Sequence, residues 1–347
     1  MPSEPLYPSY LPTRPDGYMP TLDVPEFEAD EPGRRADPLK PAIFKAGAKI
    51  TNITPRVGAE ITGVQLSQLS PAGLDEALKK YVDETITNIE AQRDQDFADV
   101  GFEKQREIVK YYGPLHKHPT MGYPAGTGPE FHVVYADETA GNLRTLLGPH
   151  TTYDLWHVDQ TFTPNVPSTT FFWVLEIPES GGGDTAFTSL TAAYEALSPT
   201  FRQLLGGLSL HHTSASVGEV ARVGMERALK EAVNTTHPLV IKHPVTGKPS
   251  LFVNPTIARK IEGLLPEESD NLLKFLHEHI KSLDFSCRVR WEKGTVVIWD
   301  QRTAAHSAVP DFADGERRHM VRMIPYGSKP QPAFPEQFNA SKGKIDG

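Results

Sequence analysis

The sequence of 347 residues has little cysteine, no long apolar run and no excess of positive charge. Its one cysteine, Cys287, excludes an internal disulfide and a zinc site built from several thiolates, so any metal would be held by nitrogen and oxygen ligands. No segment approaches the roughly 20 apolar residues that a membrane-spanning helix needs. We therefore expect no membrane association.

Charge excludes a second class of partner. The chain has 44 acidic and 35 basic residues, a formal net charge of −9. Nucleic-acid-binding proteins normally carry a basic face, so we expect no nucleic-acid partner. The first residues lack the basic region and apolar run of a secretory signal, and we expect a cytoplasmic location.

Proline, by contrast, is abundant, with nine of the 31 prolines in the first 40 residues. Because proline fixes φ and removes a backbone donor, we predict an extended N-terminal arm over residues 1–44. Aromatic residues lie between these prolines. The arm could therefore wrap a second subunit of a homo-oligomer, a dimer or tetramer, although a frayed terminus is an equal alternative. We expect one domain over residues 45–330 and a C-terminal tail over residues 331–347.

Between residues 45 and 330, short apolar or alternating runs predict many strands and few helices, without a βαβ rhythm. Strands are expected at 50–53, 59–64, 131–134, 169–176, 238–254, 286–291, 295–299 and 317–325, and helices from 70, at 102–112, 189–195, 198–205 and 267–280. The pattern favours a mainly β (α+β) fold of antiparallel strands with helices packed outside.

His157-Val158-Asp159 is the first candidate for chemistry among the 13 histidines. On a strand, residues i and i+2 project to the same face, so one imidazole and one carboxylate would lie together. A third ligand from a distant strand would complete the two-histidine, one-carboxylate triad of non-haem iron oxygenases. One or two His-x-acid pairs are expected by chance in such a composition, so the pair alone is also consistent with a surface pair.

A second candidate region lies near the C-terminus. His306 follows an apolar strand and precedes a loop, as a ligand at the mouth of a barrel would. Arg318 and Arg322 are four residues apart, so they would share one face of a strand. Two buried guanidinium groups would need anions, and arginine suits bidentate contacts with carboxylate or sulfonate. The alternative is an edge strand with solvated arginines.

Together with other segments, these motifs resemble the TauD/TfdA family of Fe(II)- and 2-oxoglutarate-dependent dioxygenases over roughly residues 45–330. The segments that carry the resemblance are Gly113–Pro119, Trp156–Phe162, Gly182–Thr185, Leu251–Asn254, and Trp299–Arg302 through His306 to Arg322. The resemblance implies a double-stranded β-helix (jelly-roll, cupin-like) core. It also implies an oxidoreductase that uses Fe(II), 2-oxoglutarate and O2.

The roles that the resemblance implies fall into three groups. The iron ligands would be His157, Asp159 and His306. Arg318, with Arg317 as an adjacent competitor, and Thr185 would bind 2-oxoglutarate, and Trp299 would lie near the iron. Substrate contacts are implied for His118, Arg322, Phe162, Gln160, Tyr153, Met121 and Phe252. Since the reaction is iron-centred, no separate acid or base is assigned.

Two departures from the family pattern concern substrate and fold. Met121, Tyr153 and Gln160 differ from the residues of taurine-cleaving members, so the anion-binding end resembles theirs and the pocket walls do not. The segment 84–92 is polar where the family usually has an apolar strand, which predicts that this strand is altered or lost.

The leading prediction is therefore oxidation of a small anionic substrate, an alkylsulfonate giving aldehyde and sulfite together with succinate and CO2. A biosynthetic oxygenase that hydroxylates, desaturates or cyclises an amino acid or natural-product intermediate is the alternative. Two further alternatives are more remote. One is a non-catalytic barrel that binds a small acid, and the other is a zinc hydrolase that uses the same three ligands. The pairs His211-His212 and His277/His279 are expected in or beside helices, where they would not act as ligands.

Overall fold

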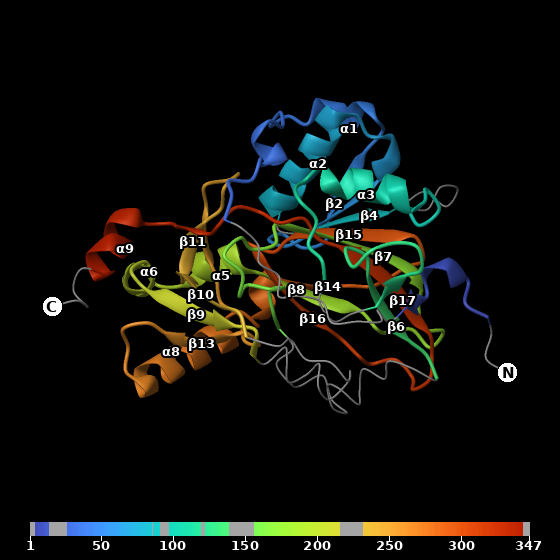
Figure 1. Ribbon diagram of the computed structural model, residues 1–347. Helices are drawn as coiled ribbons and strands as arrows, with labels where there is room; N and C mark the ends of the chain where they lie inside the picture. The colour runs from blue at the N-terminus through green and yellow to red at the C-terminus, as the bar shows by residue number, and fades with distance from the viewer. Residues whose placement is uncertain are drawn as a thin grey trace.

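The computed structural model describes residues 4–13, 26–84, 86–90, 97–118, 122–138, 156–215 and 232–342. Figure 1 shows three layers over much of the molecule: helices, a large sheet and a smaller sheet. Among the described helices, none has the length and apolar character required to cross a membrane.

The central layer is a seven-stranded sheet within the described part of the chain. In spatial order it consists of β2 (Lys49–Asn52), β3 (Ala59–Thr62), β4 (Ile86–Glu90), β15 (Thr295–Asp300), β7 (Thr169–Glu176), β17 (Arg318–Met323) and β6 (His132–Ala136). Neighbouring strands are antiparallel except β3 and β4, which are parallel. The sheet therefore brings β6, β7, β15 and β17 together from distant parts of the sequence.

One face of this sheet packs on a three-stranded sheet of β14 (Ser286–Val289), β8 (Thr185–Ser189) and β16 (Ala304–Ala308). Phe172 and Trp299 of the large sheet share one buried cluster with Phe187 and Val289 of the small sheet. The rings of Phe187 and Trp299 meet edge to face, with centroids 5.2 Å apart. This sheet-on-sheet core supports the strands that carry the candidate site.

The opposite face of the large sheet is covered by α1 (Pro41–Lys45), α2 (Pro71–Glu84) and α3 (Phe102–Lys110), at the top of Figure 1. Trp173 and Ile298 of the sheet share a second buried cluster with Leu74 of α2 and Ile108 of α3. Strand β7 is thus buried on both faces, which explains why its central residues, Phe171 to Leu175, are all apolar rather than alternating.

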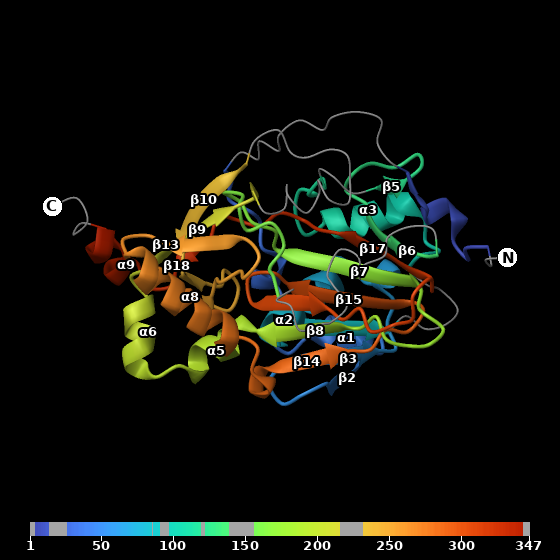
Figure 2. The same ribbon diagram turned by 90° about the horizontal axis from the view of Figure 1, so that it is seen from below.

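Four helices and two small sheets gather at one end of the molecule, on the left in Figures 1 and 2. The helices are α5 (Leu190–Ala196), α6 (Pro199–Leu205), α8 (Pro266–His279) and α9 (Pro335–Lys342). The strands form two small sheets, β10 (Asn234–Pro238), β9 (Ser209–Thr213) and β13 (Ala258–Ile261), and β12 (Pro249–Leu251), β11 (Val240–Lys242) and β18 (Gln331–Pro332). Ser189 and Ser198 cap α5 and α6 through their side chains.

The described parts of the N-terminal arm pack on their own chain. Strand β1 (Pro12–Thr13) pairs with β5 (Tyr123–Pro124), and the buried Tyr10 hydroxyl donates to the Ala98 carbonyl over 2.6 Å. Further along, the amide of Asn165 accepts from and donates to the backbone of Phe27. The arm is therefore tied to the body at two separate places.

Two expectations about local structure are wrong. The polar segment 84–92 was expected to alter or lose its strand, yet β4 pairs with both β15 and β3. His211 and His212 were expected in or beside a helix, yet both lie on β9. The expected strand at 169–176 is confirmed as β7 at both ends, and the expected helices at 102–112 and 267–280 are confirmed as α3 and α8 within a few residues.

Candidate metal centre and its surroundings

The candidate metal centre is built where the segment after residue 155 meets β16. His157 and His306 form an isolated antiparallel bridge, in which each backbone N–H donates to the carbonyl of the other over 2.9 Å. Their imidazole rings therefore lie side by side, with centroids 4.1 Å apart. The backbone bridge thus holds the two residues directly opposite each other.

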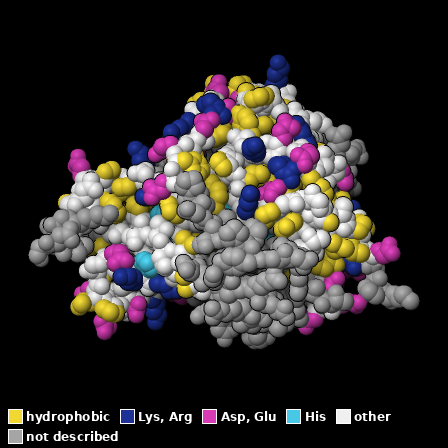
Figure 3. Space-filling model, viewed as in Figure 1, with side chains coloured by type: hydrophobic (Ala, Val, Ile, Leu, Met, Phe, Trp, Pro, Cys, Tyr) yellow, Lys and Arg dark blue, Asp and Glu magenta, His cyan; other side chains and the backbone are white. Residues whose placement is uncertain are grey.

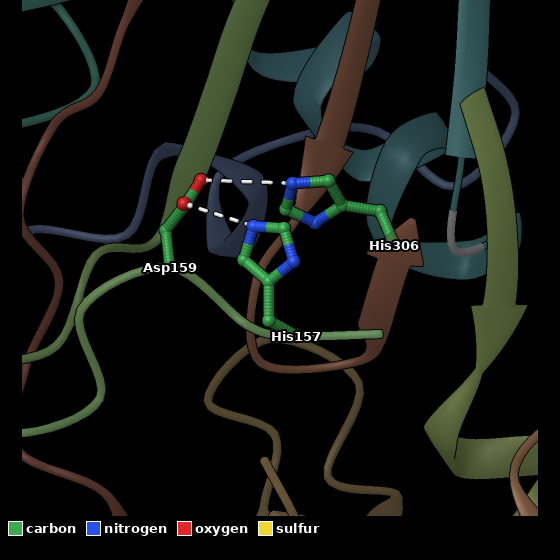
Figure 4. A group of neighbouring side chains, drawn as sticks. All are labelled: His157, Asp159 and His306. Atoms are coloured by element: carbon green, nitrogen blue, oxygen red, sulfur yellow. Dashed lines mark ion pairs between the residues drawn. The ribbon is translucent and has the colours of Figure 1, made fainter. Parts of the chain in front are cut away.

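Asp159 completes the group from two residues further along the chain. Its two oxygens lie 3.6 Å from His157 Nε2 and 3.9 Å from His306 Nε2 (Figure 4). One possible ligand atom from each residue lies within 4.8 Å of the others. The prediction that these three residues converge is confirmed.

Charge prepares these side chains to bind a cation. Burial alone would raise the pKa of Asp159, but the Arg322 guanidinium and the neighbouring imidazoles hold it well below its usual range. Burial also lowers the pKa of His306 well below its usual range, so its imidazole is neutral. A carboxylate and neutral imidazoles are the protonation states in which these groups bind metals.

The donor set fits a divalent metal. Two ligands of one ion bonded at about 2.1 Å can be at most about 4.2 Å apart, and both Asp159–histidine distances meet this limit. Two imidazoles and one carboxylate are the donor set of non-haem Fe(II) oxygenases, which leave other coordination positions open. The same donors also suit zinc, so the surrounding residues must decide the chemistry.

Gln301 holds the carboxylate of Asp159 in place, and the sequence alone did not single it out. Its Nε2 donates to Asp159 Oδ2 and to Thr170 Oγ1, each over 2.7 Å, and its Oε1 accepts from the Asp159 backbone N–H. Such bonds orient a ligand before the metal arrives. The contact joins residues 142 positions apart, so it left no local signal in the sequence.

Arg318 lies on β17, with its side chain beside the glycine turn that precedes β8. It is 5% exposed, and its Nε donates to the Gly183 carbonyl over 3.2 Å. Burial lowers its pKa to about 10, against a smaller opposing effect of Asp184. Its described contacts include no carboxylate within ion-pair distance, so this buried cation calls for an external anion.

The neighbouring residues favour Arg318 over Arg317 for that anion. Arg317 precedes β17, and its Nη1 lies 3.4 Å from a carboxylate oxygen of Glu176. Thr185, the other residue expected at the 2-oxoglutarate site, begins β8 two residues after Gly183 and is buried. Arg318 and Thr185 thus flank the same turn.

Arg322 lies on the same strand face as Arg318 and reaches the metal centre. Its Nη1 donates to both oxygens of Asp159 over 2.8 and 2.9 Å, and its Nε donates to His132 Nδ1 over 2.6 Å. A cation beside a metal centre can bind an anionic substrate there. His132 was not among the candidates from the sequence.

The expected substrate residues near Arg322 form a polar group. His116 Nε2 and Gln160 Oε1 are 2.5 Å apart, and Gln160 has a left-handed backbone, φ 48°. Burial lowers the pKa of His116 to about 4, so this ring is neutral. The ring of His118 lies 4.3 Å from that of His132 and 6.1 Å from that of His116. Strain at a non-glycine residue such as Gln160 is typical of functional sites.

The other expected residues are placed less uniformly. The buried Trp299 ring lies 4.9 Å from that of His306, as expected of a residue near the metal. Phe162, three residues after Asp159, is buried. Among the described residues, the ring contacts of Phe252 are with His212 and His237 rather than with the triad. Met121 and Tyr153 lie outside the described residues.

On the face shown in Figure 3, basic and acidic side chains are interspersed rather than gathered by sign. Nothing on that face indicates a nucleic-acid interface.

Comparison with known proteins identifies what this geometry is similar to. The family model described as "Taurine catabolism dioxygenase TauD, TfdA family" matches residues 49–324. The chain is 41% identical to the alpha-ketoglutarate-dependent dioxygenase cnsM of Penicillium expansum, over 99% of this chain and 95% of that protein. It is 36% identical to an alpha-ketoglutarate-dependent sulfonate dioxygenase of Saccharomyces cerevisiae, over 93% and 78% of the two chains.

A solved structure agrees with these sequence matches. A taurine dioxygenase from Burkholderia xenovorans superimposes with a TM-score of 0.66 and 29% identity, over 82% of this chain and 91% of that one. The match covers the body of the molecule, so the overall architecture is shared.

Proposed function

Because the chain belongs to the TauD, TfdA family and is a dioxygenase that depends on Fe(II), 2-oxoglutarate and O2, we propose that it oxidises a C–H bond of a small organic anion. The leading candidate is an alkylsulfonate, with aldehyde and sulfite as products. The observation that carries this proposal is the placement of two arginines on one face of β17, the partly buried Arg322 at the triad and the buried Arg318 beside Thr185. The proposed core is a double-stranded β-helix, supported by the packing of the three-stranded sheet on the large one.

In this proposal, His157, Asp159 and His306 hold Fe(II), and Arg318 and Thr185 hold the distal carboxylate of 2-oxoglutarate. Bound iron and 2-oxoglutarate would supply the oxidising power, with succinate and CO2 as co-products. The protein supplies orientation: Gln301 fixes the Asp159 carboxylate, and the backbone bridge fixes the two imidazoles.

Arg322 would hold the anionic head of the substrate at the edge of the metal centre. A guanidinium offers several donors in one plane, which suits a sulfonate or carboxylate. His118, Gln160 and Phe162 would line the rest of the pocket, with Trp299 behind His306. These roles are proposals that rest on geometry and on the family pattern.

Replacing each arginine separately should raise the KM of a different substrate. Arg318→Ala should raise the 2-oxoglutarate KM by about 100-fold, since it removes the charge-assisted bonds to one carboxylate, each contributing about 1.5–3 kcal/mol. Arg322→Ala should leave that KM nearly unchanged and raise the KM of the prime substrate. Initial rates of succinate formation against each substrate measure both values. If the two effects were exchanged, the assignment of the strand would be wrong.

A biosynthetic oxygenase acting on an amino acid or natural-product intermediate is the second candidate. The polar pair of His116 and Gln160 favours it over an unsubstituted alkylsulfonate, which offers no further polar group that would use this pair. The two candidates differ in one product: sulfite is released only from a sulfonate.

The test is an assay of anaerobically purified protein with Fe(II), 2-oxoglutarate, O2 and a panel of alkylsulfonates, amino acids and aryloxy acids. Succinate and sulfite are measured together. Stoichiometric sulfite from an alkylsulfonate supports the leading candidate. Substrate-stimulated succinate without sulfite supports the second, and no stimulated succinate with any compound contradicts both.

A further inference from the structure

His132 is the direct cross-strand partner of Arg322. In the pairing of β6 with β17, His132 lies opposite Arg322, Val134 opposite Met320, and Ala136 opposite Arg318. Side chains two residues apart on a strand share a face, so His132 and Arg322 face the same side as Arg318. The residue opposite each arginine therefore differs: the small Ala136 stands by Arg318, and an imidazole stands by Arg322.

The bond between His132 and Arg322 fixes the state of the imidazole. Arg322 Nε has a hydrogen and no lone pair, so at 2.6 Å His132 Nδ1 must be the unprotonated acceptor. Burial, with the charge of Arg322, lowers the pKa of His132 well below its usual range. The ring is therefore neutral, and its one N–H is on Nε2.

A neutral acceptor has a specific consequence for Arg322. Asp159 already pairs with Nη1, and a second carboxylate at Nε would compensate the guanidinium charge further and compete with an anionic substrate. The neutral imidazole holds Nε without adding that second negative charge. Nη1, which now contacts Asp159, lies at the end of the guanidinium that faces the metal centre.

The Nε2–H of His132 has no hydrogen-bond partner among the described residues, although the side chain is only 8% exposed. A buried donor without a partner costs about 1–3 kcal/mol. The ring of His118, an expected substrate contact, lies 4.3 Å away. This unpaired donor is thus in the group of side chains that surrounds the proposed substrate position.

We propose that His132 is a positioning and specificity residue: its Nδ1 orients Arg322, and its Nε2–H donates to an oxygen of the substrate's anionic head. Arg322 and His132 together then favour a head with three oxygens, such as a sulfonate, over a carboxylate with two. This inference rests on the proposed role of Arg322 in binding substrate.

Three substitutions separate the two halves of the proposal. His132→Asn keeps an acceptor where Nδ1 stands and removes the distal donor. His132→Gln keeps a donor near Nε2 and removes the acceptor, and His132→Leu removes both. Val134→Ala, on the same face of β6, is the matched control, because it disturbs packing without touching Arg322.

The orientation of Arg322 is measured without substrate, from the 15N–1H NMR resonance of its Nε. The protein is loaded with Zn(II), which is diamagnetic and does not broaden the signal. The resonance should be sharp and protected from exchange in wild type, Val134→Ala and His132→Asn, and lost in His132→Leu and His132→Gln. A protected resonance in His132→Leu, or its loss in His132→Asn, would overturn the positioning role.

Substrate contact is read as the calorimetric affinity for butane-1-sulfonate and for butyrate, in protein loaded with Mn(II) and N-oxalylglycine, which do not react. His132→Asn should weaken sulfonate binding by about tenfold, the effect of one hydrogen bond, with little effect on butyrate. Unchanged preference for sulfonate would overturn the donor role. If wild-type protein bound neither compound, the proposed anion site and the donor role would both fail, while the Arg322 resonance would still decide the positioning role.

Discussion

Replacing His306 with alanine should lower 2-oxoglutarate-dependent succinate formation by more than about 100-fold. Changes in groups that merely orient a ligand cost about 10–100-fold in metal affinity or activity, and His306 is one of the three proposed ligands themselves. Since His306 is buried and bonded through its backbone to His157, truncating its side chain should leave the bridge in place. The expected loss is therefore one of metal binding rather than of fold.

The measurement is the Fe(II) content of the purified protein beside its rate of succinate formation, with circular dichroism as the check on folding. His211→Ala is the matched control: this half-buried histidine on β9 pairs with Glu262 and lies outside the metal centre. It should bind iron and turn over like wild type. A His306→Ala protein with normal iron content and rate would contradict the proposed centre.

Much of the fold could be predicted from the sequence because burial leaves a periodic signal. Both bounds of strand β7 were predicted correctly, since a strand buried on two faces has a continuous apolar centre, here Phe171 to Leu175. Strand β4 was not, because its segment is polar. It is held by backbone pairing with β15 on one side and β3 on the other, and such pairing does not require apolar side chains.

The metal ligands could also be predicted from the sequence, whereas the residues that support them could not. His157 and Asp159 could be predicted together from their two-residue spacing, although the expected strand is only an isolated bridge at His157 followed by a turn at Asp159. Gln301 and His132 could not be assigned roles, because each acts on a partner more than 100 residues away. The pair His211-His212 was set aside because a helix was expected there; both lie on β9, where adjacent residues point to opposite faces.

The N-terminal arm also makes a contact that no sequence pattern indicated. Glu31 is buried, and its Oε1 accepts from Arg302 Nη1 over 2.6 Å. Arg302 also donates through Nε to Asp300 Oδ1 and through Nη2 to Oδ2, and His243 Nε2 lies 3.0 Å from the same Oδ2. This buried network joins the arm to the turn between β15 and β16. Gln301, which holds Asp159, lies between its two central residues.

Replacing Arg302 with leucine should lower the free energy of unfolding by about 3–5 kcal/mol at pH 7, the range observed when one partner of a buried ion pair is removed. The side chains of Arg302, Asp300 and Glu31 are 3%, 0% and 3% exposed, so water cannot solvate the two carboxylates that would remain. Chemical denaturation measures the change. Lys329→Leu is the matched control, because Lys329 pairs with Glu26 of the same arm at the surface, and its loss should cost no more than about 1 kcal/mol.

The pH dependence of this difference provides an independent check on its cause. Burial alone would raise the pKa of Asp300, but Arg302 and His243 hold it well below its usual range. A carboxylate with a lowered pKa in the folded state stabilises the protein above its unfolded pKa of about 3.9, and this contribution is lost as the pH falls through the folded value. The deficit of Arg302→Leu should therefore be complete at pH 7 and shrink as the pH falls through the pKa of Asp300 in the variant, which burial without the Arg302 charge raises relative to wild type. A deficit that stayed constant with pH would point to lost packing of the arginine stem, and the buried charges would not be what fastens the arm to the turn that carries Gln301.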